Sequence, residues 1–198
     1  MTKESAKVQA PDLSRRKFLT LGSASVVASV AAMALPSTVE AAPLEMVLRP
    51  LQDRSLNLYN THTGEHLSEV YWSHGRYRGD ALNRINHFLR DHRSGESHSI
   101  DPHVLDLIAA VNHKVEGHGP IHIISGYRSP STNAWLASNS DGVAFHSLHM
   151  QGKAVDIRLP GRSVRHVGRA AMALRGGGVG MYPASDFVHV DSGRLRHW

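Results

Sequence analysis

The 198-residue chain contains no cysteine. Without thiols it cannot form a disulfide framework, a thiolate metal site, a cysteine nucleophile or a lipid-modified N-terminal cysteine. Aromatic residues make up only 6% of the chain and charged residues 20%. The hydrophobic content of 41% is nevertheless too high for a disordered protein. Length and composition therefore predict one globular domain with a tail.

The first 41 residues have the pattern of an export signal. Residues 14–19 read Ser-Arg-Arg-Lys-Phe-Leu and lead into an uncharged run, rich in Ala, Ser and Val, that ends near residue 35. This pattern resembles a twin-arginine signal, and small residues before Ala42 predict cleavage there. A Sec signal or an uncleaved anchor is the alternative. We expect residues 42–198 to form a single domain located in the periplasm.

The charge balance argues against a nucleic-acid partner. The formal net charge of the whole chain is +5, and five basic and three acidic residues lie within residues 1–41, which leaves a net +3. A charge this small does not indicate nucleic-acid binding. The uncharged run near the N-terminus is short and interrupted by serine, so no stable membrane span is expected after signal cleavage.

The hydrophobic pattern of the remaining chain mixes strands and helices without a regular βαβ alternation. Strands are expected over residues 55–59, 66–72, 121–124, 154–159, 179–182 and 187–190, with the first two forming a hairpin. Helices are expected over residues 80–93, from 102 to about 116, over 132–138 and over 164–174, with Asp80, Asp101 and Ser163 as N-caps. The pattern predicts an α+β fold with a central antiparallel sheet and flanking helices.

Two segments, 147–156 and 186–191, concentrate side chains of the metal-ligating type. The two imidazoles of His149 and His189 and the carboxylate of Asp156 can hold Zn²⁺ and leave a fourth position for water. Zinc lowers the pKa of such a water toward about 7. If the two strands pair, ligands from each can meet on one face of the sheet. The sequence therefore predicts a zinc site at these three residues.

Hydrolysis of an amide also needs a carboxylate that is not a ligand, to take the proton of the water and pass it to the leaving amine. Asp186 lies three residues before His189, at the entrance of the strand, where it can reach over the metal. Asp191 lies two residues after His189, on the same face of the strand. Asp191 is therefore either a partner of an imidazole or a rival for the role of base.

The spacing of these residues resembles the zinc signature Ser-x-His-x-x-Gly-x-Ala-x-Asp…His of the D-Ala-D-Ala peptidases, which have the hedgehog/DD-peptidase fold. The resemblance implies this fold and zinc as the cofactor. It implies that Asp186 is the base, because the family carries an acidic residue three positions before the last histidine. It also implies that Arg128, in the turn Ser-Gly-Tyr-Arg-Ser over 125–129, binds and polarises the substrate carbonyl.

A closer resemblance, to the murein endopeptidase K family, extends over nearly the whole chain after the signal. It is carried by the twin-arginine signal and by residues 60–65, 89–93, 178–180 and 187–193. It implies a zinc metallopeptidase that acts as an endopeptidase on the peptide crosslinks of peptidoglycan, including links between two diaminopimelate residues.

Two other functions are compatible with the same residues. One is a D,D- or L,D-carboxypeptidase that trims stem peptides, and the other is a non-catalytic, zinc-stabilised module that binds peptidoglycan or a protein. The presence of Asp186 favours catalysis, since a binding module needs no base. His146, three residues before His149, is a further candidate for contact with the site. Tyr182 and Trp198 are expected in the core or in a groove wall, and the glycines at 176–180 where a substrate chain passes close to the backbone.

Overall fold

We describe a computed structural model, which covers residues 43–49, 51–140 and 143–198. The expected signal peptide, residues 1–41, and the expected cleavage site before Ala42 lie outside these described residues. Within them, no helix is long and apolar enough to cross a membrane.

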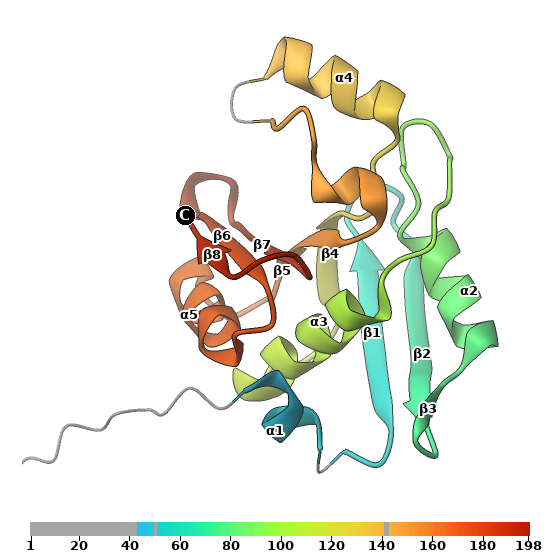
Figure 1. Cartoon of the computed structure of the whole chain (residues 1–198), viewed down its shortest axis with the longest axis vertical. Helices are drawn as coiled ribbons and strands as arrows, with labels where there is room; N and C mark the ends of the chain where they lie inside the picture. The colour runs from blue at the N-terminus through green and yellow to red at the C-terminus, as the bar shows by residue number, and fades with distance from the viewer. Residues whose placement is uncertain (1–42, 50, 141–142) are drawn as a thin grey trace, which may run out of the picture. The chain divides into compact units, whose positions relative to one another are not determined.

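Helices and strands mix along the chain, as the hydrophobic pattern predicts (Figure 1). Their order is α1 (Leu44–Leu48), β1 (Arg54–Asn60), β2 (His66–Ser73), β3 (Arg76–Tyr77), α2 (Gly79–Phe88), α3 (Pro102–Lys114), β4 (Ile121–Ser125), α4 (Pro130–Asn139), η1 (Leu148–Gln151), β5 (Ala154–Arg158), α5 (Val164–Leu174), β6 (Gly178–Tyr182), η2 (Pro183–Ser185), β7 (Phe187–Asp191) and β8 (Arg196–His197). The segments η1 and η2 are short 3-10 helices.

The eight strands of the described residues form one sheet in the order β3-β2-β1-β4-β5-β7-β6-β8. Most neighbouring strands are antiparallel, which confirms an α+β fold with a largely antiparallel sheet and flanking helices. Two pairs, β1/β4 and β6/β8, are parallel. The parallel pairing of β1 with β4 is possible because the chain between these two strands contains α2 and α3 and is long enough for a crossover.

Local sequence signals predicted several helix boundaries correctly, but both boundaries of α2 incorrectly. Asp101 and Ser163 cap α3 and α5, their side chains accepting hydrogen bonds from backbone N–H groups of the first turn. Asp80 does not cap α2, which begins at Gly79, and instead forms a 3.2 Å ion pair with Arg84. The helix also ends at Phe88 rather than at residue 93, because the chain turns there to meet the segment that follows β4.

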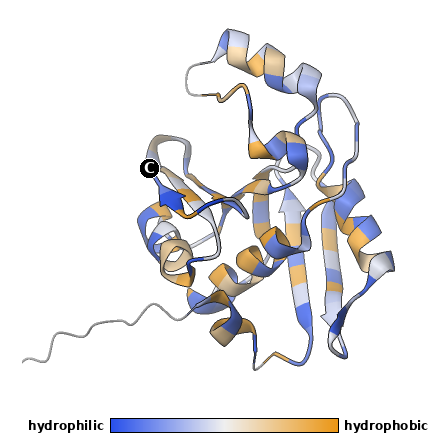
Figure 2. Cartoon of the chain, in the orientation of Figure 1, coloured by the Kyte–Doolittle hydropathy of each residue, from blue (hydrophilic) through white to orange (hydrophobic). Residues whose placement is uncertain are grey.

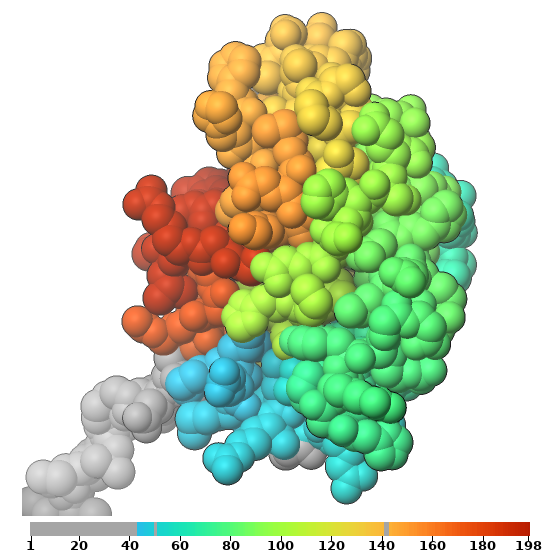
Figure 3. Space-filling view, turned by 45° about the vertical axis from the view of Figure 1, so that its right-hand side comes forward, coloured from blue at the N-terminus to red at the C-terminus, as the bar shows by residue number. Residues whose placement is uncertain are grey.

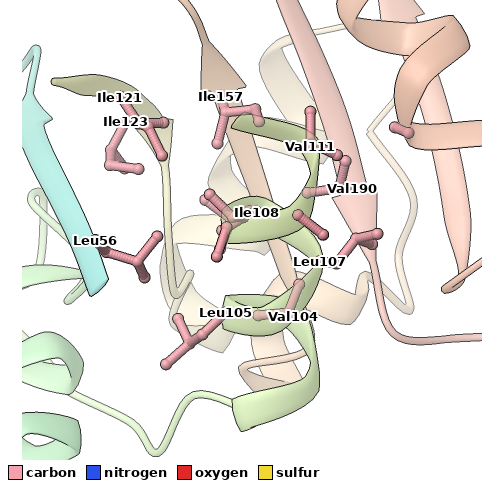
Figure 4. Packing of buried hydrophobic residues seen from close by; sticks show 14 of the residues in the cluster. Leu56, Val104, Leu105, Leu107, Ile108, Val111, Ile121, Ile123, Ile157 and Val190 are labelled. Carbon is pink, nitrogen blue, oxygen red and sulfur yellow. The ribbon is translucent and has the colours of Figure 1, made fainter. Parts of the chain in front are cut away.

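The sheet separates a hydrophobic core from a polar face. Hydrophobic and hydrophilic residues alternate along β1 and β2, whereas α3 is hydrophobic over most of its length (Figure 2). Ile157 of β5 and Val190 of β7 are fully buried and lie against α3, near Ile108 (Figure 4). Because successive side chains of a strand point to opposite faces, Asp156 and His189 must lie on the other face of the sheet.

Candidate metal centre

Three buried side chains converge on this polar face: His149 from η1, Asp156 from β5 and His189 from β7. Asp156 and His189 are direct partners in the antiparallel register of β5 and β7. The Nδ1 of His189 lies 2.8 Å from the Oδ1 of Asp156. The Nε2 of His149 lies 3.2 Å from that Nδ1 and 3.3 Å from the same carboxylate oxygen. The structure thus brings together the three residues that the sequence predicts as ligands.

Hydrogen bonds on the far side of each ring determine which nitrogens face the cluster. The Nδ1 of His149 lies 2.8 Å from the carbonyl oxygen of Gly126, which can only accept, so Nδ1 carries the proton and Nε2 presents a lone pair. The Nε2 of His189 lies 3.0 Å from the Oδ2 of Asp191 and donates to it in the same way. The Nδ1 of His189 is therefore also a lone pair directed at the cluster in the neutral ring.

Three acceptors that point at one another repel unless a cation lies among them. The ligand atoms of a tetrahedral zinc site, with bonds of about 2.0–2.1 Å, are separated by roughly 3.3 Å. The observed separations of 2.8, 3.2 and 3.3 Å are close to this value. Two imidazole nitrogens and one carboxylate oxygen are also the donor set of many catalytic zinc sites. The residues present therefore fit a divalent metal such as zinc.

The pKa values of His189 and Asp156 also show that the cluster favours a positive charge between its side chains. Burial lowers the pKa of His189, but hydrogen bonds to Asp156 and Asp191 outweigh it and raise the pKa to about 9. For the carboxylate of Asp156, burial alone would raise the pKa. The adjacent His149 and His189 lower it by more than burial raises it, so the pKa of Asp156 lies below the ordinary value. A metal that binds here has to displace a proton.

Asp191 fixes the orientation of His189 and is itself held firmly. Its side chain is fully buried, and Arg196 donates to both of its oxygens, at 2.9 and 2.6 Å. Its Oδ1 also accepts hydrogen bonds from the backbone N–H groups of Gly178 and Gly193. Burial raises its pKa, but the bonds to His189 and Arg196 outweigh this and lower it. Asp191 is thus the partner of an imidazole, one of the two roles that the sequence left open.

The glycines of β6 make room for these supporting groups. Gly178 and Gly180 are the register partners of Asp191 and His189 on the neighbouring strand. A Cβ on Gly178 would overlap the side chains of Asp191 and Arg196, and one on Gly180 would overlap the indole of Trp198. The space beside Gly178 and Gly180 is thus filled by the protein itself, which corrects the expectation that substrate backbone occupies it.

The cluster opens into a cavity of about 560 Å³, and Arg128 lines it together with His149, Asp156 and His189. The Nη1 of Arg128 donates to the Oδ1 of Asn133 at 3.3 Å. Burial lowers the pKa of Arg128, although not enough to remove the charge of a guanidinium. The structure therefore places the predicted substrate-binding arginine beside the predicted metal ligands.

The sequence did not indicate the role of Asp91, which anchors the turn that carries Arg128. Asp91 is buried, and its Oδ2 accepts a 2.9 Å hydrogen bond from the N–H of Ser129. The carbonyl of Leu89 accepts from the N–H of Tyr127 at 2.7 Å, and a Cβ on Gly126 would overlap that carbonyl. The segment 89–91 therefore leaves α2 in order to dock against this turn, which explains the early end of the helix.

The expected base, Asp186, is not among the described residues that line the cavity, although its neighbours Ser185 and Phe187 are. Its carboxylate lies 2.8 Å from the Nε of Arg158, and 61% of its side chain is exposed. His146, in contrast, is exposed and lines the cavity directly. The geometry therefore does not place Asp186 at the cluster, and its role as base stays a prediction.

The described residues that lead into η1, from 143 onward, border the cavity on one side. Residues 130–140 and 143–150, coloured yellow to orange, project above the C-terminal strands, coloured red (Figure 3). Asn133 of α4 donates from its Nδ2 to the carbonyls of Ala144 and Phe145, which ties the segment after α4 to this helix. Ala144, His146 and Leu148 of this segment contribute to the lining.

Comparison with known proteins agrees with this site. The family model described as Peptidoglycan L,D-endopeptidase MepK matches residues 49–198. The chain is 38% identical over 187 residues to the Peptidoglycan L,D-endopeptidase MepK of Escherichia coli K12, covering 94% of this chain and 98% of that protein. It is 37% identical over 188 residues to the Probable peptidoglycan L,D-endopeptidase MepK of Haemophilus influenzae, covering 94% and 96%. The chain therefore belongs to the MepK family of peptidases, as the resemblance seen in the sequence indicates.

Proposed function

We propose that this protein is a zinc-dependent endopeptidase that hydrolyses peptide crosslinks of peptidoglycan. The observation that carries the proposal is the convergence of three lone pairs, from His149, Asp156 and His189, at the floor of an open cavity. The names of the relatives state the same activity and the L,D class of bond. The side-chain cluster supports metal-dependent hydrolysis, and the names of the relatives support an endopeptidase of L,D type.

His149, Asp156 and His189 would hold the metal. When bound, zinc supplies Lewis-acid activation of a water molecule and of the scissile carbonyl. The protein contributes the rigid positioning of the ligands: β5 and β7 fix Asp156 and His189 in register, and the carbonyl of Gly126 fixes the ring of His149. Ligands held in this way need no rearrangement to bind the ion.

Arg128 would bind the carbonyl oxygen of the scissile amide. Its guanidinium lines the same cavity as the three ligands, and its hydrogen bond to Asn133 leaves other N–H groups free to donate to substrate. A charged donor in a partly desolvated cavity stabilises the negative charge that develops on this oxygen. The link from Asp91 to Ser129 keeps the turn in place while the substrate binds.

Two residues are candidates for the base that moves the proton from water to the leaving amine. Asp186 has the sequence position that the family resemblance implies, but it must leave Arg158 to act. His146 lines the cavity without such a rearrangement, and an imidazole is a side chain that commonly moves protons in hydrolysis. The geometry supports His146, and the sequence pattern supports Asp186.

The cellular location follows from the substrate and from the N-terminal pattern. Peptidoglycan lies outside the cytoplasmic membrane, so an enzyme that cleaves it must be exported. We infer export by the twin-arginine route to the periplasm, with residues 1–41 as the signal and 42–198 as the peptidase domain.

Digestion of a purified crosslinked muropeptide dimer tests the function. An endopeptidase converts the dimer into two monomers, which mass spectrometry identifies. A carboxypeptidase instead releases a terminal amino acid and leaves the crosslink intact. A dimer that stays uncleaved while the zinc-loaded protein sediments with peptidoglycan would favour a binding module and contradict the proposal.

A further inference from the structure

The C-terminal residue, Trp198, forms a wall of the cavity directly beside the metal cluster. The centroid of its ring lies 5.3 Å from that of His189, with the two planes tilted by 47°. Although its indole is large and apolar, 48% of Trp198 is exposed, and it lies outside the buried hydrophobic cluster. It therefore contributes little to the core and presents apolar surface next to the predicted reaction centre.

Several contacts hold this indole in one orientation. Its Nε1 donates a 2.8 Å hydrogen bond to the hydroxyl of Tyr182, and the guanidinium of Arg196 lies 4.9 Å from its ring centroid. The backbone of Trp198 is bonded to Val179 and Met181 of β6. Gly180 leaves the space that the ring fills. An exposed aromatic ring with this many constraints is positioned rather than mobile.

The polar edge of the indole is already satisfied by Tyr182, so the surface left for a ligand is its flat apolar face. Such a face binds hydrocarbon chains by removing their surface from water and loses little conformational entropy in doing so. Crosslinked stem peptides carry aliphatic side chains next to their amide bonds, and they have to pass this wall to reach the metal ligands.

We propose that Trp198 is a substrate-binding residue, whose indole face packs against the aliphatic part of the residue next to the scissile amide. This inference rests on the proposed endopeptidase function and adds a specificity determinant to it. Tyr182 acts as a positioning residue, because its hydroxyl sets the angle of the indole. The contact contributes to binding of the substrate rather than to the chemical step, so its loss raises KM and leaves kcat nearly unchanged.

Steady-state kinetics on the crosslinked dimer test the inference. Trp198→Ala should raise KM about tenfold, the effect expected for loss of one aromatic contact, with kcat within about twofold and a full equivalent of zinc per chain. Trp198→Phe keeps an aromatic face and should restore most of the affinity. Tyr182→Phe, which keeps its ring but loses the hydroxyl, should raise KM by a smaller factor. Trp135→Ala is the matched control, since Trp135 is also exposed but does not line the cavity.

Two kinetic results would overturn the inference. One is an unchanged KM in Trp198→Ala. The other is a loss of kcat in parallel with zinc, which would show that Trp198 only supports His189. A variant with Trp72→Phe and Trp135→Phe leaves Trp198 as the sole tryptophan of the three in the chain, so that selective excitation of tryptophan reports on it alone. Its emission should change on titration with the monomeric product, whereas a constant emission contradicts contact. The fluorescence titration does not depend on turnover. If the wild-type enzyme is inactive, the proposed function is rejected, whereas the titration still tests whether Trp198 contacts the product.

Discussion

The Nε2 of His189 lies 3.0 Å from the Oδ2 of Asp191, two residues further along the same strand. This bond directs the other nitrogen of the ring, Nδ1, toward Asp156. A histidine that donates to a buried carboxylate is fixed in its tautomer and is a better metal ligand. The alternation of β7 thus places the ligand and its support on one face, while Val188 and Val190 enter the core.

Replacing Asp191 by Asn should weaken zinc binding without removing a ligand. An amide offers one acceptor oxygen in place of two, so Arg196 loses one of its two hydrogen bonds in either orientation of the amide. If the amide nitrogen takes the place of Oδ2, His189 loses its acceptor as well. We expect zinc affinity to fall about 10- to 100-fold and the free energy of unfolding to fall by about 2 kcal/mol. Competition with a chelator of known affinity and thermal unfolding measure the two effects. Asp80→Asn, which removes a surface carboxylate, is the control, and an equal loss of zinc affinity in it would reject the role of Asp191.

The base can be identified with two single variants, Asp186→Ala and His146→Ala, both of which leave the three predicted ligands intact. The variant that lacks the base should keep one zinc per chain and lose kcat by about 10²- to 10⁴-fold. The other variant should stay within a few-fold of the wild type. Zinc content and kcat as a function of pH are measured on each. If both variants retain activity, the proton is taken by another group and both assignments are wrong.

A methyl group at Gly177 should destabilise the fold. Its Cβ would overlap the backbone carbonyl of Asp191, which cannot move without disturbing β7. We expect Gly177→Ala to lower the free energy of unfolding by about 1–3 kcal/mol. Gly79→Ala is the matched control, because nothing lies near the added methyl and Gly79 is helical. Thermal unfolding of the two variants compares them, and equal melting temperatures would contradict the close approach at Gly177.

His92 should make the stability depend on pH between 6.5 and 4. Burial, and then His62 and Arg93, lower the pKa of His92 from 6.5 to about 4. In this range the unfolded chain binds a proton that the folded chain does not, so stability falls as the pH falls. The contribution is about 1 kcal/mol once solvent screening of a half-exposed group is allowed for. His92→Gln should reduce the loss of stability between pH 7 and pH 5, while the exposed control His103→Gln should not.

The convergence of the three predicted ligands could be predicted because the signals for it are local. Alternation within β5 and β7 places Asp156 and His189 on one face, and a short spacing in the sequence brings His149 to the start of β5. The helix caps at Asp101 and Ser163 could be predicted for the same reason, since a capping side chain binds N–H groups only two or three residues away.

Contacts between distant segments could not be predicted in this way. Asp91 supports the turn at Ser129, 38 residues later in the chain, and nothing near Asp91 in the sequence indicates this partner. Asp186 adopts a left-handed backbone conformation, with φ of 54°, and meets Arg158 from another strand. The sequence position of Asp186, three residues before His189, therefore did not predict that its carboxylate lies against Arg158 rather than at the metal cluster. Trp198 reaches the cavity only because β8 pairs in parallel with β6.

The most direct test of the account is to measure zinc content and crosslink cleavage together, on residues 42–198 and on the His189→Ala variant. The wild type should carry one zinc per chain and convert crosslinked dimers into monomers. A chelator should abolish this activity, and added zinc should restore it. His189→Ala should lose both zinc and cleavage. Cleavage that survives the chelator, or that survives in His189→Ala, would contradict the claim that His149, Asp156 and His189 hold the metal on which hydrolysis depends.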